Sequence, residues 1–121
     1  MNKHPHKNLE AWKKAMDIVV DIYKLTSSFP KSEVYGLTSQ LRRASVSVPS
    51  NIAEGSVGRS EKSFSNYLTI ALGSLTEVDT QLELANRIGY VNNEDFIEMS
   101  NRLDTCKGLI YGLRRSILNK L

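Results

Sequence analysis

Residues 42–55 read Arg42-Arg43-Ala44-Ser45-Val46-Ser47-Val48-Pro49-Ser50-Asn51-Ile52-Ala53-Glu54-Gly55, and they depart from the plain amphipathic helix pattern around them. Apolar side chains recur here every three or four residues, the period of one helix face, at Leu37, Leu41, Ala44, Val48 and Ile52. Pro49 falls inside this pattern, where it removes one backbone hydrogen bond at a cost of about 3 kcal/mol. We therefore predict a helix that is kinked at Pro49 rather than broken, with Ser32 as its N-cap and Gly55 as a left-handed cap at its end.

The preceding helix is predicted from Asn8 to Thr26, with Pro30 ending the segment. It carries two neighbouring apolar stripes, which are Leu9, Trp12, Met16, Val19 and Tyr23, and Ala15, Ile18, Ile22 and Leu25. Together these stripes form a face wider than one helix contact requires. Either the helix touches two neighbours within the bundle, or part of this face packs on another protomer.

Two longer helices follow. Ser60 is the expected N-cap of the first, which continues to Ile88 and is closed by Gly89. Its apolar positions step by four and three through Phe64, Leu68, Ala71, Leu75, Val78, Leu82 and Ala85, and the small pair Gly73-Ser74 suggests a close helix approach. Asn93 is the expected cap of the last helix, whose apolar positions are Phe96, Met99, Leu103, Cys106, Ile110, Leu113 and Ile117.

The chain of 121 residues is 40% hydrophobic and 24% charged, values typical of a folded domain rather than of a disordered chain. No apolar run approaches the length of a membrane span, and the first seven residues lack the apolar segment of a secretory signal. The single cysteine, Cys106, cannot form an internal disulfide and fits a reducing compartment. We expect one cytoplasmic domain over residues 1–121, all-α, folded as an antiparallel up-down-up-down four-helix bundle.

Long motifs of this chain resemble those of the small bacterial "four helix bundle protein" family, first noticed in intervening sequences of 23S ribosomal RNA genes. The segments that carry the resemblance are residues 23–44, with Phe29-Pro30-Lys31-Ser32-Glu33 and Tyr35-Gly36-Leu37, Ser47 to Gly55, and Tyr67 to Glu77. The chain is more distantly similar to the accessory protein of diversity-generating retroelements, which binds a reverse transcriptase and nucleic acid. The resemblance implies a bundle that assembles into a ring, a homopentamer, and it implies no enzymatic activity and no agreed molecular function.

A polar stripe is the first candidate site. Arg43, Ser47, Asn51 and Glu54 step by four, four and three residues and therefore share one helix face. Arg43 and Glu54 lie about 16 Å apart along the axis, too far to pair, so each needs another partner such as Glu77, a second protomer or a ligand. Three interpretations stay open, namely a solvated face, a polar network within or between protomers, and a ligand or nucleic-acid site.

A basic end is the second candidate site. The predicted topology brings the start of the first helix, the loop at residues 56–59 and the end of the last helix together. This end holds nine basic side chains against the three acidic ones at Glu10, Glu54 and Glu61, a net charge of +6, while the remainder carries −3. The basic side chains are Lys3, Lys7, Lys13, Lys14, Arg59, Lys62, Arg114, Arg115 and Lys120. They fit phosphate contacts to RNA or DNA, although cations at helix ends also arise as ordinary complements to the helix dipole.

Catalytic and metal sites find little support in the sequence. His4 and His6 lie outside the predicted helices, so we expect neither a general base nor a metal site from them, and no Glu-x-x-His pair suits a di-iron bundle. Cys106 occupies a core position, and no cofactor is indicated. The sequence thus predicts a non-enzymatic oligomeric binding module that docks RNA or DNA on its basic end, with a protein adaptor ring that recruits a partner protein as the alternative.

Overall fold

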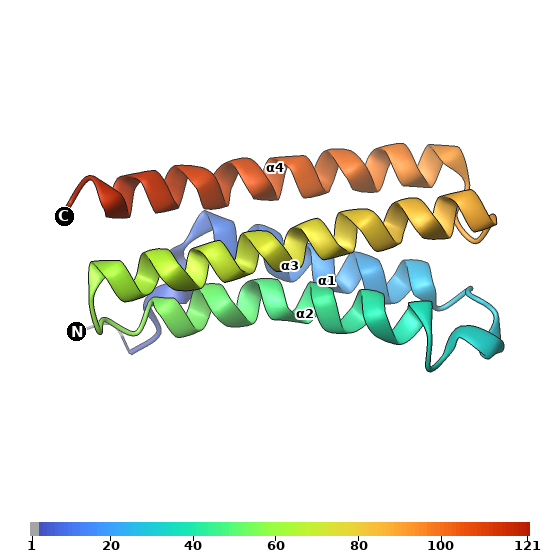
Figure 1. The fold of residues 1–121 in the computed structure, drawn as a ribbon, viewed down its shortest axis with the longest axis horizontal. Helices are drawn as coiled ribbons and strands as arrows, with labels where there is room; N and C mark the ends of the chain where they lie inside the picture. The colour runs from blue at the N-terminus through green and yellow to red at the C-terminus, as the bar shows by residue number, and fades with distance from the viewer. Residues whose placement is uncertain (1–2) are drawn as a thin grey trace.

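The computed structural model describes residues 3–121. Its elements in chain order are a 3₁₀ turn η1 (Pro5–Asn8), α1 (Glu10–Thr26), a second 3₁₀ turn η2 (Lys31–Glu33), α2 (Leu37–Gly55), α3 (Glu61–Ile88) and α4 (Asn93–Leu118). The four helices lie side by side in antiparallel order, and both ends of the chain lie with the α2–α3 loop at one end of the bundle (Figure 1). The predicted all-α four-helix bundle is confirmed, and residues 3–121 contain no strand.

All four helices contribute to one hydrophobic core. On α1 the buried stripe is Ala11, Ala15, Ile18 and Ile22. In the neighbouring stripe Leu9 and Trp12 pack against the core, whereas Met16 and Tyr23 are 41% and 43% exposed. The wide apolar face of α1 is therefore only half used inside the bundle. A single domain over residues 1–121 stays a prediction, since residues 1 and 2 lie outside the described part.

The start of α2 differs from the prediction. Ser32 belongs to η2, and α2 begins only at Leu37, whose backbone N–H donates to the Glu33 carboxylate Oε1 at 3.1 Å. The other carboxylate oxygen of Glu33 accepts a hydrogen bond from the Tyr90 hydroxyl at 2.9 Å. Glu33 therefore caps α2 and ties it to the loop that follows α3.

The helix continues through Pro49, which is buried inside it. The expected continuity is confirmed, whereas the kink itself stays a prediction. The structure contradicts the left-handed cap at Gly55, because the glycines with positive φ are Gly58 and Gly89 among the described residues. Gly55 instead marks a close approach of two helices, since a Cβ built on it would lie 2.7 Å from the Cβ of Tyr67 on α3.

The ends of the other helices agree more closely with the sequence. Ser60 caps α3 by accepting from the Ser63 N–H at 3.0 Å, and Gly89 closes that helix with φ 99°. The cap of α4 is Asn92 rather than Asn93, because the Asn92 side chain accepts from the Asp95 N–H at 2.7 Å. At the N-terminus, α1 begins at Glu10, two residues after the predicted start at Asn8, because Leu9 has an extended backbone that separates α1 from η1.

Candidate nucleic-acid interface

The three segments that were predicted to form the basic end lie together at one end of the bundle. The described N-terminal residues, the α2–α3 loop and the C-terminal turn of α4 all lie at the left of Figure 1. The far end carries the α1–α2 connection, which includes η2, and the α3–α4 connection, and its acidic side chains outnumber the basic ones. The antiparallel packing thus separates the net charges of +6 and −3 along the bundle axis.

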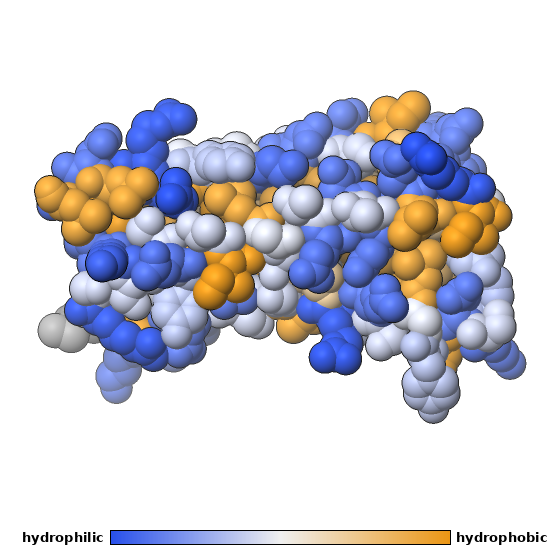
Figure 2. Space-filling model, in the orientation of Figure 1, coloured by the Kyte–Doolittle hydropathy of each residue, from blue (hydrophilic) through white to orange (hydrophobic). Residues whose placement is uncertain are grey.

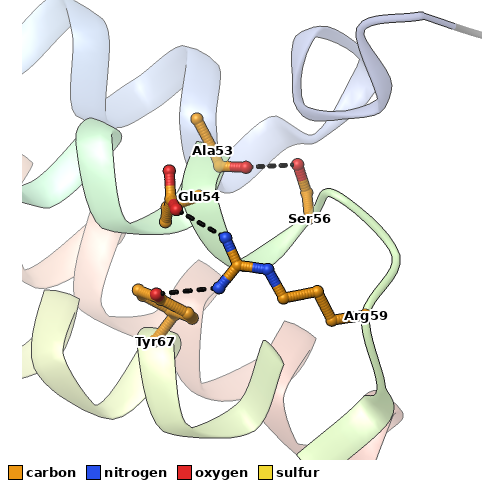
Figure 3. A network of polar contacts seen from close by, with 5 residues as sticks. All are labelled: Ala53, Glu54, Ser56, Arg59 and Tyr67. Atoms are coloured by element: carbon orange, nitrogen blue, oxygen red, sulfur yellow. Dashed lines mark hydrogen bonds and ion pairs between the residues drawn. The ribbon is translucent and has the colours of Figure 1, made fainter. Parts of the chain in front are cut away.

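Arg59 is held by its own neighbours. Its guanidinium donates to the Glu54 carboxylate at 2.8 Å and to the Tyr67 hydroxyl at 3.1 Å, and it lies 5.8 Å from the centre of the Tyr67 ring. Figure 3 shows these contacts joining the end of α2, the following loop and α3, beside a hydrogen bond from the Ser56 hydroxyl to the Ala53 carbonyl. The hydrogen bond to Tyr67 and, to a smaller extent, the hydrogen bond to Glu54 raise the pKa of the Arg59 guanidinium. The sequence analysis counted Glu54 both in the polar stripe and at the basic end that holds Arg59, and the structure pairs the two side chains in one contact, the Arg59 latch.

Arg114 is positioned and still has donors to offer. Its Nε donates to the Thr69 hydroxyl on α3 at 3.1 Å, and that hydroxyl donates in turn to the Ser65 carbonyl at 3.1 Å. This relay fixes the direction of the guanidinium, while its two terminal nitrogens have no partner among residues 3–121. An oriented guanidinium with free terminal nitrogens suits bidentate binding of a phosphate.

Four of the other seven predicted basic residues, on α1, α3 and α4, differ in their availability. Lys13 pairs with Glu10 at 3.4 Å on the exposed surface. Lys14 is half-buried and lines a groove between α1 and α4 rather than the tip of the bundle. Lys62 and Arg115 are exposed and have no ion-pair partner within the described chain. The unpaired cations of the basic end therefore include Lys62 in the first turn of α3 and Arg114 and Arg115 in the last turns of α4, besides the exposed Lys3, Lys7 and Lys120.

The polar stripe of α2 does not form one network. Its middle does, because the Ser47 hydroxyl bonds the Ser74 hydroxyl on α3 at 2.8 Å and the Asn51 amide donates to both the Ser47 carbonyl and hydroxyl. Ser74 is buried, so this cluster of hydrogen bonds joins α2 to α3 within the interface between the two helices. Ser47 and Asn51 thus take part in polar contacts within the bundle, whereas Glu54 pairs with Arg59.

Arg43 and Glu77, which the sequence suggested as partners, form no ion pair with each other. Both are exposed and line a polar groove of about 610 Å³ between α2 and α3, together with Tyr35, Ser39, Gln40, Ala44, Ser47, Ser74 and Gln81. The Gln81 side-chain oxygen at this groove is buried without a hydrogen-bond partner among the described residues. Neither Arg43 nor Glu77 is neutralised within residues 3–121.

The side chains that could suggest catalysis are accounted for by packing. Cys106 is fully buried, and burial raises the pKa of its thiol to about 11, which leaves it protonated and unreactive at neutral pH. His6 packs edge-on against Trp12 with 5.0 Å between ring centres. The described residues hold no group of three side chains suited to a metal ion.

One interhelical ion pair was missed by the sequence analysis. Arg102 on α4 donates to the Asp21 carboxylate on α1 at 2.6 Å and also pairs with Glu98 one turn earlier. These residues border two adjoining grooves between α1 and α4, of about 280 and 460 Å³. Arg102 follows Glu98 by four residues, a spacing that indicates an ion pair within one helix. The sequence therefore contained no sign of the second partner, Asp21 on α1.

No helix in the described part of the chain is both long and apolar enough to span a membrane. No curated protein matches the chain. Among solved structures, it is similar to a protein of unknown function from the S23 ribosomal protein family of Bacteroides thetaiotaomicron, with 25% sequence identity and a TM-score of 0.77. That match covers 86% of this chain and 97% of the other. The family model described as 23S rRNA-intervening sequence protein matches residues 7–112, and the chain therefore belongs to that family.

Proposed function

We propose that the protein is a non-enzymatic, oligomeric binding module that docks RNA or DNA on its basic end. The observation that carries this proposal is the set of unpaired cations at the start of α3 and the end of α4, with Arg114 oriented by the Thr69 relay and Lys62 and Arg115 exposed. Phosphate contacts of this kind give affinity without reading sequence. The family carries no catalytic description, and the buried thiol offers no nucleophile at neutral pH.

Oligomerisation is supported by the outside of α1 and α2. Their outer faces form an apolar groove of about 310 Å³ lined by Trp12, Met16, Val19, Val46, Pro49, Ser50 and Ala53. A second protomer on this groove would bury the stripe of α1 that the bundle leaves outside. A closed ring, a pentamer as the resemblance implies, would turn every basic end to one side and multiply the positive field. The whole assembly would work in the cytoplasm.

The test compares the native protein with Arg114→Glu/Arg115→Glu in binding to a structured RNA and to duplex DNA at low salt. We expect the variant to lose at least tenfold in affinity for both, because each substitution replaces a phosphate donor with a repelling charge. Lys24→Glu/Lys31→Glu, at the opposite end of the bundle, makes the same charge change and serves as the matched control. Solution masses of all three proteins must agree, and a native mass near that of one protomer would contradict the ring.

A protein adaptor is the second candidate, and the apolar groove of α1 and α2 favours it because apolar surface suits a protein partner better than a phosphate backbone. It predicts no nucleic-acid binding by the native protein even at low salt. Under that result the basic end is a solubility feature, and the proposed docking of RNA or DNA is wrong.

A further inference from the structure

An exposed tyrosine stands between cations on the outer face of α4. Lys107, Tyr111 and Arg115 are spaced by four residues, which places them in one row along the helix. The row is about 12 Å long at 1.5 Å per residue. Tyr111 is 49% exposed, and its side chain has no hydrogen-bond or ring partner among the described residues. Asp104, nearly two turns before Tyr111, is the nearest acidic residue along α4.

The surroundings of the Tyr111 ring are open. Gly108 and Gly112 flank it on α4, and a Cβ built on either would meet nothing within 4 Å in the described chain. The bond from Arg114 to Thr69 sets the register of α3 against α4, and one turn further along α3 comes Gly73, which is equally open. Glycine inside a helix is less favourable than alanine, and none of these three is required by packing within the described part of the bundle.

This arrangement differs from a plain phosphate-docking surface. Cations alone bind the backbone of a duplex, whose bases are stacked on one another and out of reach of the ring. An exposed ring between cations offers a platform on which one unpaired base can stack while the adjoining phosphates reach Lys107 and Arg115. The view in Figure 2 shows the face across α2, α3 and α4 as mostly hydrophilic to intermediate, with separate apolar groups.

We propose that the row Lys107–Tyr111–Arg115 binds single-stranded nucleic acid, with Tyr111 stacking one base and the flanking cations, joined by Arg114, holding the phosphates. This proposal rests on the proposed function and specifies its ligand, a single strand rather than a duplex. Charge complementarity selects the occupant, because the cations Lys107 and Arg115 lie one turn on either side of the exposed Tyr111 ring, on a part of α4 that also exposes Leu109 and Leu118. Next to the row, on α3, the hydroxyl group that Arg114 contacts belongs to the uncharged Thr69.

The test measures the affinity of the native protein for a labelled twelve-nucleotide oligothymidine and for a duplex of the same length at one salt concentration. We expect tighter binding of the single strand. Tyr111→Ala should weaken binding of the single strand by about five- to a hundred-fold, the usual effect of removing the platform for one stacked base, and leave duplex binding unchanged. Tyr111→Phe keeps the ring and should bind the single strand within about twofold of the native protein.

Tyr35→Ala is the matched control, because Tyr35 is 96% exposed but lies at the opposite end of the bundle. It should change neither affinity. Equal single-strand affinities for the native protein and Tyr111→Ala would overturn this inference and would leave the basic-end docking intact if Arg114→Glu/Arg115→Glu still abolishes binding. An absence of binding to both nucleic acids would overturn the inference and the proposed function together.

Discussion

Glu33 is the residue on which the start of α2 depends. It accepts hydrogen bonds from the Leu37 N–H and the Tyr90 hydroxyl, and these two bonds, in that order, lower the pKa of its carboxyl group. The hydrogen bond between Tyr90 and Glu33 raises the pKa of the Tyr90 hydroxyl. One carboxylate therefore connects the first turn of α2 to the loop between α3 and α4, through a hydrogen bond between residues that are 57 positions apart in the chain.

This contact predicts an acid-sensitive contribution to stability. The pKa of Glu33 is lower in the folded protein than the value of about 4.3 in an unfolded chain. The stabilisation is therefore fully present above about pH 4.3 and is lost as the pH falls through the lower folded value. Glu33→Gln should reduce the free energy of unfolding at pH 7 and remove part of its decline in acid, as followed by urea unfolding at several pH values. A variant with the native acid dependence would contradict this role.

Sequence reasoning missed this cap for a physical reason. A search for N-caps looks for a short polar side chain directly before the helix, and Ser32 met that description. The actual cap is a longer side chain from a separate 3₁₀ turn, and it is fixed by a tyrosine that only the folded bundle brings near. The caps at Ser60 and Gly89 were predictable because the groups that satisfy them are within three or four residues.

The α2–α3 pair is the element contact in which small residues matter most. Gly55 lets α2 approach α3, because a Cβ there would also lie 2.9 Å from the Phe64 ring. Ser47 and Ser74 meet across the same pair at 2.8 Å. Gly73, by contrast, faces open space among the described residues, although the sequence suggested that it and Ser74 shared one close contact.

The two glycines therefore predict opposite results for the same substitution. Gly55→Ala should lower the free energy of unfolding by about 1–3 kcal/mol, because the added methyl group overpacks the contact with Tyr67. Gly73→Ala should raise it by up to about 1 kcal/mol, because alanine is the better helix former and nothing obstructs it. Chemical denaturation of the two variants beside the native protein checks both signs. A loss of stability in Gly73→Ala, or none in Gly55→Ala, would contradict this assignment.

The helices themselves were predictable from the chain because their apolar period is long and regular. The period of α3 placed all 28 of its residues correctly, and the positions of Leu68, Leu75 and Leu82 in the core followed from it. The pairing of side chains across helices was not predictable, since hydrophobic period fixes which face is buried and not which polar groups meet. Glu54 with Arg59, and Asp21 with Arg102, are pairs of that kind.

The whole bundle is a polarised object, and this property was accessible before the structure. Antiparallel topology decides which charges share an end, so the net +6 and −3 followed from counting residues once the helices were placed. What the count could not reveal is that Glu10 and Glu54 already engage Lys13 and Arg59. Lys13 and Arg59 are consequently not among the free cations of this end, whereas Lys62, Arg114 and Arg115 are.

The salt dependence of nucleic-acid binding tests the basic end most directly. Each phosphate that the protein neutralises contributes about 0.7 on a single strand, and about 0.9 on a duplex, to the slope of the logarithm of the binding constant against the logarithm of salt concentration. We predict a steep slope for the native protein and a shallower one for Arg114→Gln/Arg115→Gln, by the equivalent of about two phosphates for each engaged protomer. Lys24→Gln/Lys31→Gln should keep the native slope. A native slope near zero, or identical slopes for the native protein and Arg114→Gln/Arg115→Gln, would contradict phosphate docking at the basic end.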